Sequence, residues 1–139
     1  MTTATKWVLT RHSLDMLYQR VLRRRDPSLP LDPPEDKNPI RERALEMLER
    51  AESGKEVYEE LSPWLERCHR HSRDDRYIAK LDRQTRATFI IKRSKEGDIV
   101  LTALRAVCRT CDRPHCEHVQ TARRRLRGRV PGFFMVEDE

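Results

Sequence analysis

The sequence predicts an α+β domain in which helices cover one face of an antiparallel sheet. A length of 139 residues suits one domain, the apolar residues of the first half recur at helical spacing, and beyond Asp75 the spacing becomes that of strands. We expect an α+β body at 1–107 with a Pro-rich internal loop at 26–39, then a cysteine-containing turn with an Arg-rich helix at 108–129, and a tail at 130–139.

The N-terminal part is predicted to contain one strand and one helix. Residues 6–10 are β-branched and aromatic, which favours a strand, and Ser13 is expected to cap a helix that runs to about Arg25. Five prolines within thirteen residues then predict an extended loop, because each removes a backbone donor and fixes φ. These are Pro27, Pro30, Pro33, Pro34 and Pro39.

Two more helical segments precede the strands. Asn38 and Pro39 are typical of a helix start, and Gly54 is typical of a helix end. The apolar spacing resumes at 57–68, where Pro63 lacks an N–H, so we expect Ser62 to cap a new turn.

The C-terminal half is predicted to consist of strands and one helix. Residues 76–81, 87–92 and 98–107 are rich in β-formers, and 94–97 is expected to form a hairpin turn. The composition of 117–127 favours a helix. The tail contains Phe133, Phe134 and Met135, which are expected either to pack on the core or to serve as a docking peptide.

The positive charge is concentrated near the C-terminus. The chain has 29 Lys and Arg against 23 Asp and Glu, a net charge of +6, and the stretch 105–129 has eight arginines and two acids, 8 − 2 = +6. This asymmetry predicts contact with nucleic acid or an acidic protein surface. The expected contact residues are Arg105, Arg109, Arg123, Arg124, Arg125, Arg127 and Arg129.

A metal site is predicted at the start of this basic stretch. Cys108 and Cys111 form a C-x2-C turn, and Cys116 and His118 follow within seven residues. Three thiolates and one imidazole fill the four positions of a tetrahedral Zn²⁺, which predicts a structural ion. His115 is an alternative to either Cys116 or His118.

The segment Cys116-Glu-His118-Val119, followed by a helix, resembles the end of a SWIM-type zinc finger, a module that binds nucleic acid and protein. The resemblance covers about a dozen residues and implies that Cys116 and His118 are ligands. This chain has C-x2-C where that family has C-x-C.

The remaining cysteine and histidines do not predict a second site. Cys68, His69 and His71 are close in sequence, but Cys68 continues an apolar helical stripe. His12 could act as a general base, yet no serine, cysteine or acid stands in a recognisable partnership with it. We therefore expect no catalytic residues and consider the protein more consistent with binding than with catalysis.

The predicted order of elements also resembles RelE-like endoribonuclease toxins. The strand pair at 88–93 and 99–105 is similar to the central hairpin of that family. The resemblance implies RNA cleavage by Lys92, Arg93 and Arg105.

In size, basicity and lack of a catalytic motif, the chain is similar to small phage-encoded factors that bind host RNA polymerase. This likeness implies a protein partner, with or without nucleic acid, and neither a small-molecule substrate nor a membrane; a directly DNA-binding repressor is a further alternative. No apolar run of about 18 residues and no signal pattern occur, so a cytoplasmic location is expected. Arginine outnumbers lysine 23 to 6, which is typical of a thermophile or of a GC-rich genome.

Overall fold

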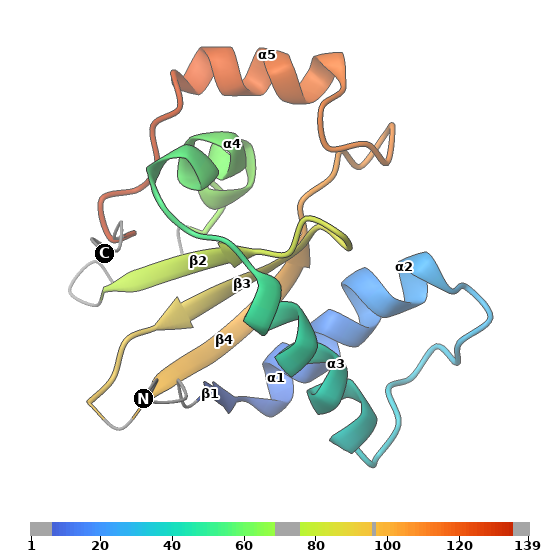
Figure 1. Ribbon diagram of the computed structural model, residues 1–139. Helices are drawn as coiled ribbons and strands as arrows, with labels where there is room; N and C mark the ends of the chain where they lie inside the picture. The colour runs from blue at the N-terminus through green and yellow to red at the C-terminus, as the bar shows by residue number, and fades with distance from the viewer. Residues whose placement is uncertain (1–6, 69–75, 96, 135–139) are drawn as a thin grey trace.

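A four-stranded sheet with helices on both faces forms the centre of the molecule (Figure 1). The computed structural model describes residues 7–68, 76–95 and 97–134. The strands are β1 (Trp7–Leu9), β2 (Tyr77–Leu81), β3 (Ala87–Lys92) and β4 (Asp98–Arg105), in the order β1-β4-β3-β2. The α+β class is confirmed. The sheet is mixed rather than antiparallel throughout, because β1 runs parallel to β4.

The first helical segment comprises α1 (Arg11–Leu17), the π-helical turn η1 (Tyr18–Leu22) and α2 (Arg23–Arg25). Thr10, not Ser13, is its N-cap: the Thr10 hydroxyl oxygen accepts a hydrogen bond of 3.1 Å from the Ser13 N–H. The same hydroxyl donates to the carbonyl of Val100 at 2.9 Å. The cap therefore also ties the helix start to β4, which favours Thr10 over the serine three residues later.

The next helices are α3 (Asn38–Arg50) and α4 (Lys55–Leu65), and α4 runs through Pro63 without interruption. The expectation of a new turn capped by Ser62 was wrong. Pro63 cannot donate to the carbonyl of Glu59, but the Ser62 hydroxyl donates to that carbonyl at 2.9 Å. None of the helices in the described ranges is long and apolar enough to cross a membrane.

Two hydrophobic cores lie on opposite faces of the sheet. On one face, α1, η1 and α3 pack against side chains that include Ile78, Phe89 and Ile91. On the other face, α4 packs against side chains that include Ala79 and Ile90. The expected one-sided arrangement was wrong because β2 and β3 are almost entirely buried, and a strand that is apolar on both sides requires cover on both.

The C-terminal residues form the outer layer of the second core. Helix α5 (Glu117–Leu126) lies over α4, and Val119 is its buried residue (Figure 1). Phe134 packs edge-on against Tyr58, and Phe133 packs edge-on against Tyr77. Of the two alternatives for the tail, these two phenylalanines pack on the core, and Met135 lies outside the described residues.

The outer edge of β2 has partners for three alternating N–H groups. Tyr77 donates to the carbonyl of Phe133, and Leu81 donates to that of Glu52. Between them, the buried N–H of Ala79 donates to the Tyr58 hydroxyl of α4 at 2.9 Å. An edge strand occupied in this way offers no free donors at these positions for another chain.

Tyr58→Phe should lower the free energy of unfolding by about 1–3 kcal/mol, because it leaves the buried Ala79 N–H unpaired while the ring remains. Urea unfolding followed by circular dichroism measures the change. Tyr18→Phe is the control, since it removes a hydroxyl that donates to the exposed Pro30 and should have a smaller effect. Equal effects of the two substitutions would contradict the role given to Tyr58.

Candidate metal centre

Four side chains converge where β4 leads into α5. The sulfur atoms of Cys108, Cys111 and Cys116 and a ring nitrogen of His118 lie within 4.8 Å of one another. The Nδ1 atom of His118 lies 3.9 Å from the Cys108 sulfur, 3.4 Å from the Cys111 sulfur and 3.9 Å from the Cys116 sulfur. The cluster can hold a metal ion.

The distances fit one tetrahedral ion. With metal–sulfur bonds of about 2.3 Å and a metal–nitrogen bond of about 2.05 Å, tetrahedral angles place sulfur and nitrogen about 3.6 Å apart. The three observed distances bracket this value. Four protein ligands leave no coordination position for water, so the chemistry of the donor set is structural rather than catalytic.

A tight turn brings the first two cysteines to the same side. The Cys108 N–H donates to the carbonyl of Arg113 at 2.9 Å, and the Asp112 N–H donates to the carbonyl of Cys108 at 2.8 Å. Asp112 has a φ of 56°, in the left-handed region that aspartate tolerates better than most residues. The turn folds back on itself and leaves both thiols facing α5.

The other two ligands belong to the first turn of α5. Cys116 is the N-cap residue and His118 is the second residue of the helix. His115 is not in the cluster; its Nε2 atom lies 3.9 Å from a carboxylate oxygen of Glu60. Of the alternatives left by the sequence, the geometry favours Cys116 and His118 over His115.

The thiol of Cys108 is electrostatically prepared for a cation. Hydrogen bonds from the backbone N–H groups of Cys111 and Thr110 lower the pKa of Cys108 to about 6, which favours the thiolate. Burial and the neighbouring sulfur of Cys116 raise the pKa of Cys111. Adjacent thiolates repel each other, and a bound cation removes this repulsion.

Glu60 on α4 connects α5 to the turn between β2 and β3. Its carboxylate accepts hydrogen bonds from Arg86 at 2.8 Å and from Arg83 at 2.9 Å. Its backbone carbonyl accepts a hydrogen bond from Arg123 of α5 at 2.9 Å. Sequence reasoning did not identify Glu60, because an isolated glutamate on a helix carries no motif.

The predicted contact arginines divide into two groups. Arg123 is half-buried against Glu60, and Arg105 is paired with Asp112, so these two hold structure together. The others are exposed. They are Arg109, Arg124, Arg125, Arg127 and Arg129.

The residues nominated through the toxin resemblance do not come together. Ala87 is paired with Arg105 and Lys92 is paired with Ile99, so Lys92 and Arg105 lie at opposite ends of the β3–β4 ladder. Five residues of strand separate the two ends by roughly 16 Å. Arg93 lies beyond Lys92, 3.7 Å from Asp98.

Cys68 has the role expected of an apolar residue. It packs against the second core, and burial raises the pKa of its thiol to about 11, so the thiol stays protonated at neutral pH. His69 and His71 lie outside the described residues. His12 is exposed and lines a groove next to β4.

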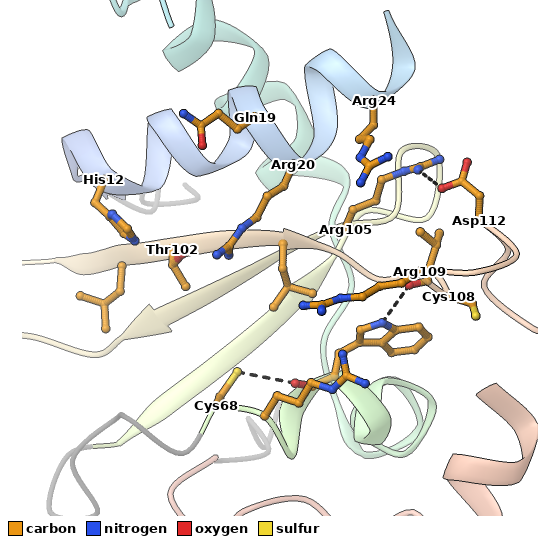
Figure 2. A pocket seen from close by; sticks show the side chains of 15 residues that line it. His12, Gln19, Arg20, Arg24, Cys68, Thr102, Arg105, Cys108, Arg109 and Asp112 are labelled. Carbon is orange, nitrogen blue, oxygen red and sulfur yellow. Dashed lines mark hydrogen bonds and ion pairs between the residues drawn. The ribbon is translucent and has the colours of Figure 1, made fainter. Parts of the chain in front are cut away.

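That groove contains functional candidates that the sequence analysis missed. Arg20, Arg24 and Arg67 line it together with Arg105 and Arg109 (Figure 2). The spacing of four residues between Arg20 and Arg24 was a usable signal, since it places both on one side of a helix. Arg67 could not be assigned to this group from the sequence, because only the tertiary fold brings it next to Arg20 and Arg24.

No protein-family model, curated protein or solved structure matches this chain. The resemblances to SWIM-type fingers, RelE-like toxins and phage-encoded factors therefore stay expectations.

His118→Ala should abolish stoichiometric metal binding, because it removes one of four converging ligands, whereas His115→Ala should retain it. Native mass spectrometry of the purified variants measures the metal content. Loss of metal from both variants, or from neither, would contradict the ligand set.

Glu60→Gln should lower the free energy of unfolding at pH 7 by about 1.5–3 kcal/mol, because charge-assisted hydrogen bonds are lost. Burial alone would raise the pKa of Glu60, but the hydrogen bonds from Arg86 and Arg83 outweigh it and lower the pKa below the ordinary 4.5. This stabilisation is present above pH 4.5 and is lost as the pH falls further. The difference between wild type and variant in urea unfolding should therefore shrink below that pH, and a constant difference would contradict the assignment.

Proposed function

We propose that the protein is a zinc-stabilised regulatory protein that binds the transcription machinery, nucleic acid or both, and that it has no catalytic activity. The observation that supports this most is the cluster of Cys108, Cys111, Cys116 and His118, which links α5 to the end of β4. In this proposal, the ion holds a basic helix in a defined position on an otherwise neutral body.

Zinc is the proposed metal because of the donor set. Thiolates together with one imidazole favour Zn²⁺ over Mg²⁺ or Ca²⁺, which prefer oxygen. A complete set of protein ligands is typical of structural zinc sites. Such a site contributes on the order of 10 kcal/mol to the folding of the element that it closes.

The proposed contact surface is the exposed side of α5 and the residues after it. Arg124, Arg125, Arg127 and Arg129 are exposed, and the ion pair of Arg125 with Glu66 is long, at 3.8 Å. The inward side of the helix is occupied by Val119 and Arg123. Guanidinium groups match phosphate in bidentate geometry, so this surface suits a nucleic-acid backbone or phosphate-like acidic groups.

RNA polymerase is the proposed protein partner. The chain outside the stretch 105–129 has 21 basic and 21 acidic residues, so its net charge is zero. A neutral body suits a protein surface better than a polyanion, whereas α5 suits phosphate or acid. The proposal therefore has two surfaces with different partners. A direct DNA-binding repressor would need only the second surface.

The polymerase proposal is tested by affinity purification of the tagged full-length protein from a host lysate, followed by mass spectrometry. We expect the subunits of RNA polymerase to be enriched relative to an untagged lysate. Recovery of ribosomes, or of no specific protein, would contradict the polymerase proposal. Tight duplex binding without polymerase would favour the repressor instead.

The role of α5 is tested by removing two of its exposed arginines. Arg124→Ala combined with Arg127→Ala should reduce the slope of log K against log salt for single-stranded nucleic acid by about 1.4, since each lost phosphate contact contributes about 0.7. The control combines Arg11→Ala with Arg43→Ala, which removes the same charge from exposed positions on α1 and α3. Equal slopes for the two double variants would contradict a contact through α5.

A further inference from the structure

A second basic surface lies outside α5, in an open groove of about 900 Å³ beside β4 (Figure 2). Five arginines line it, from η1, α2, the residues just after α4, β4 and the metal turn, and Asp112 is the one acidic residue among the described residues that line it. Together with Asp112, the five arginines give the groove a net charge of 5 − 1 = +4. They are Arg20, Arg24, Arg67, Arg105 and Arg109.

The groove exists because β1 is short. β1 pairs with β4 only from Asp98 to Val100, so the rest of β4 has no strand neighbour on that side. The π-helical turn and α2 run past this free stretch, and Arg20 donates to the carbonyl of Ala103 at 3.0 Å. Figure 2 shows Arg20 and Arg24 extending from this helical segment toward β4.

The positive charge in the groove is poorly neutralised within the chain. In the described ranges, the side chains of Arg24, Arg67 and Arg109 have no hydrogen-bond or ion-pair partner. Arg105 is paired with Asp112, but its buried Nε atom has no acceptor. Guanidinium groups gathered without counter-charges repel one another, and an anionic ligand would relieve this repulsion.

Apolar side chains also line the groove. Leu101 and Leu104 are half-buried there, and the indole of Trp64 is in the wall, where its N–H donates to the carbonyl of Val107. A nucleotide combines a phosphate with the flat apolar face of a base, and this combination matches a groove that is lined by both arginines and apolar side chains. An acidic peptide has the anionic groups without the flat face.

We propose that this groove binds the phosphates of a single-stranded nucleic-acid segment. A volume of about 900 Å³ lies within the range of ligand pockets and holds a few nucleotides rather than a duplex. The arginines would contact the backbone, and the apolar lining would accept bases without reading their identity. The site is separate from the α5 surface, because several of its residues come from the N-terminal half of the chain. It rests on the nucleic-acid role proposed above and extends it.

The metal turn forms one wall of the groove. Cys108 is both a metal ligand and a lining residue, and Arg109 and Asp112 belong to the same turn. A bound metal therefore fixes the positions of Arg109 and, through Asp112, of Arg105. Binding of single-stranded nucleic acid to this wall therefore requires the metal-bound form of the protein.

The test is fluorescence anisotropy of a labelled single-stranded oligonucleotide of about twelve thymidines with the metal-loaded full-length chain. Arg24→Ala combined with Arg109→Ala should weaken binding by about tenfold or more. The charge-matched control, Arg11→Ala with Arg43→Ala, should change affinity by less than about twofold. All four side chains are exposed, so the thermal melting of both variants should match that of the wild type.

The α5 double variant separates this inference from the proposed function. Loss of affinity in the groove variant but not in the α5 variant supports the groove and contradicts the α5 contact. Loss in the α5 variant alone overturns the groove. Equal losses in the groove variant and its control, equal binding of polyglutamate, a preference for duplex, or displacement of the oligonucleotide by micromolar inorganic phosphate would also overturn it.

Discussion

The hydrogen-bonded ion pair between Glu60 and Arg86 holds the separate parts of the molecule in register. Glu60 lies on α4, whereas Arg86 lies in the turn between β2 and β3 and also donates to the carbonyl of Ala106 at 3.0 Å. The backbone of Glu60 in turn receives Arg123 from α5. One helix position thus joins the segment after β4, through Arg86, to the second half of α5, through Arg123. Both side chains are mostly buried, so removing Glu60 would leave Arg86 without its carboxylate partner in a poorly hydrated place, whereas removing Arg86 would leave Glu60 with Arg83 as its remaining partner.

The metal cluster depends on this arrangement because its ligands come from two segments. Cys108 and Cys111 follow the end of β4, and Cys116 and His118 open α5. An ion can join them only if both segments already lie close together. Val119 is the one buried residue of α5 among those described, so the helix itself adds little hydrophobic anchoring. The buried ion pair and the four Cys and His side chains therefore act together. The ion pair brings the two segments close to each other, and a metal ion bound by the four side chains would join them.

Elements with a clear local pattern could be predicted from the sequence. The α+β class, the strand β3 and a Cys/His cluster within 108–118 follow from spacing, because periodicity and ligand spacing are local properties, but spacing left His115 as an alternative to Cys116 or His118. The two-sided cover of the sheet, the uninterrupted helix at Pro63 and the groove around Arg20 depend on packing. In sequence, a strand that is buried on both faces cannot be distinguished from any other apolar run. Exposed arginines on a helix are indistinguishable from an ordinary solvated surface, because the groove that they line exists only where β1 leaves part of β4 without a neighbour.

The two edges of the sheet differ in a way that bears on self-association. At the β2 edge, the alternating N–H groups of Tyr77, Ala79 and Leu81 already have acceptors, so a second copy would find no template there. On the other side of the sheet, β4 has no strand neighbour beyond its short pairing with β1, but a symmetric pairing of two copies along this stretch would crowd ten guanidinium groups together. Mutual repulsion would thus prevent the protein from forming fibrils or strand-exchanged dimers along this edge, as lysines do on the edges of many natural sheets.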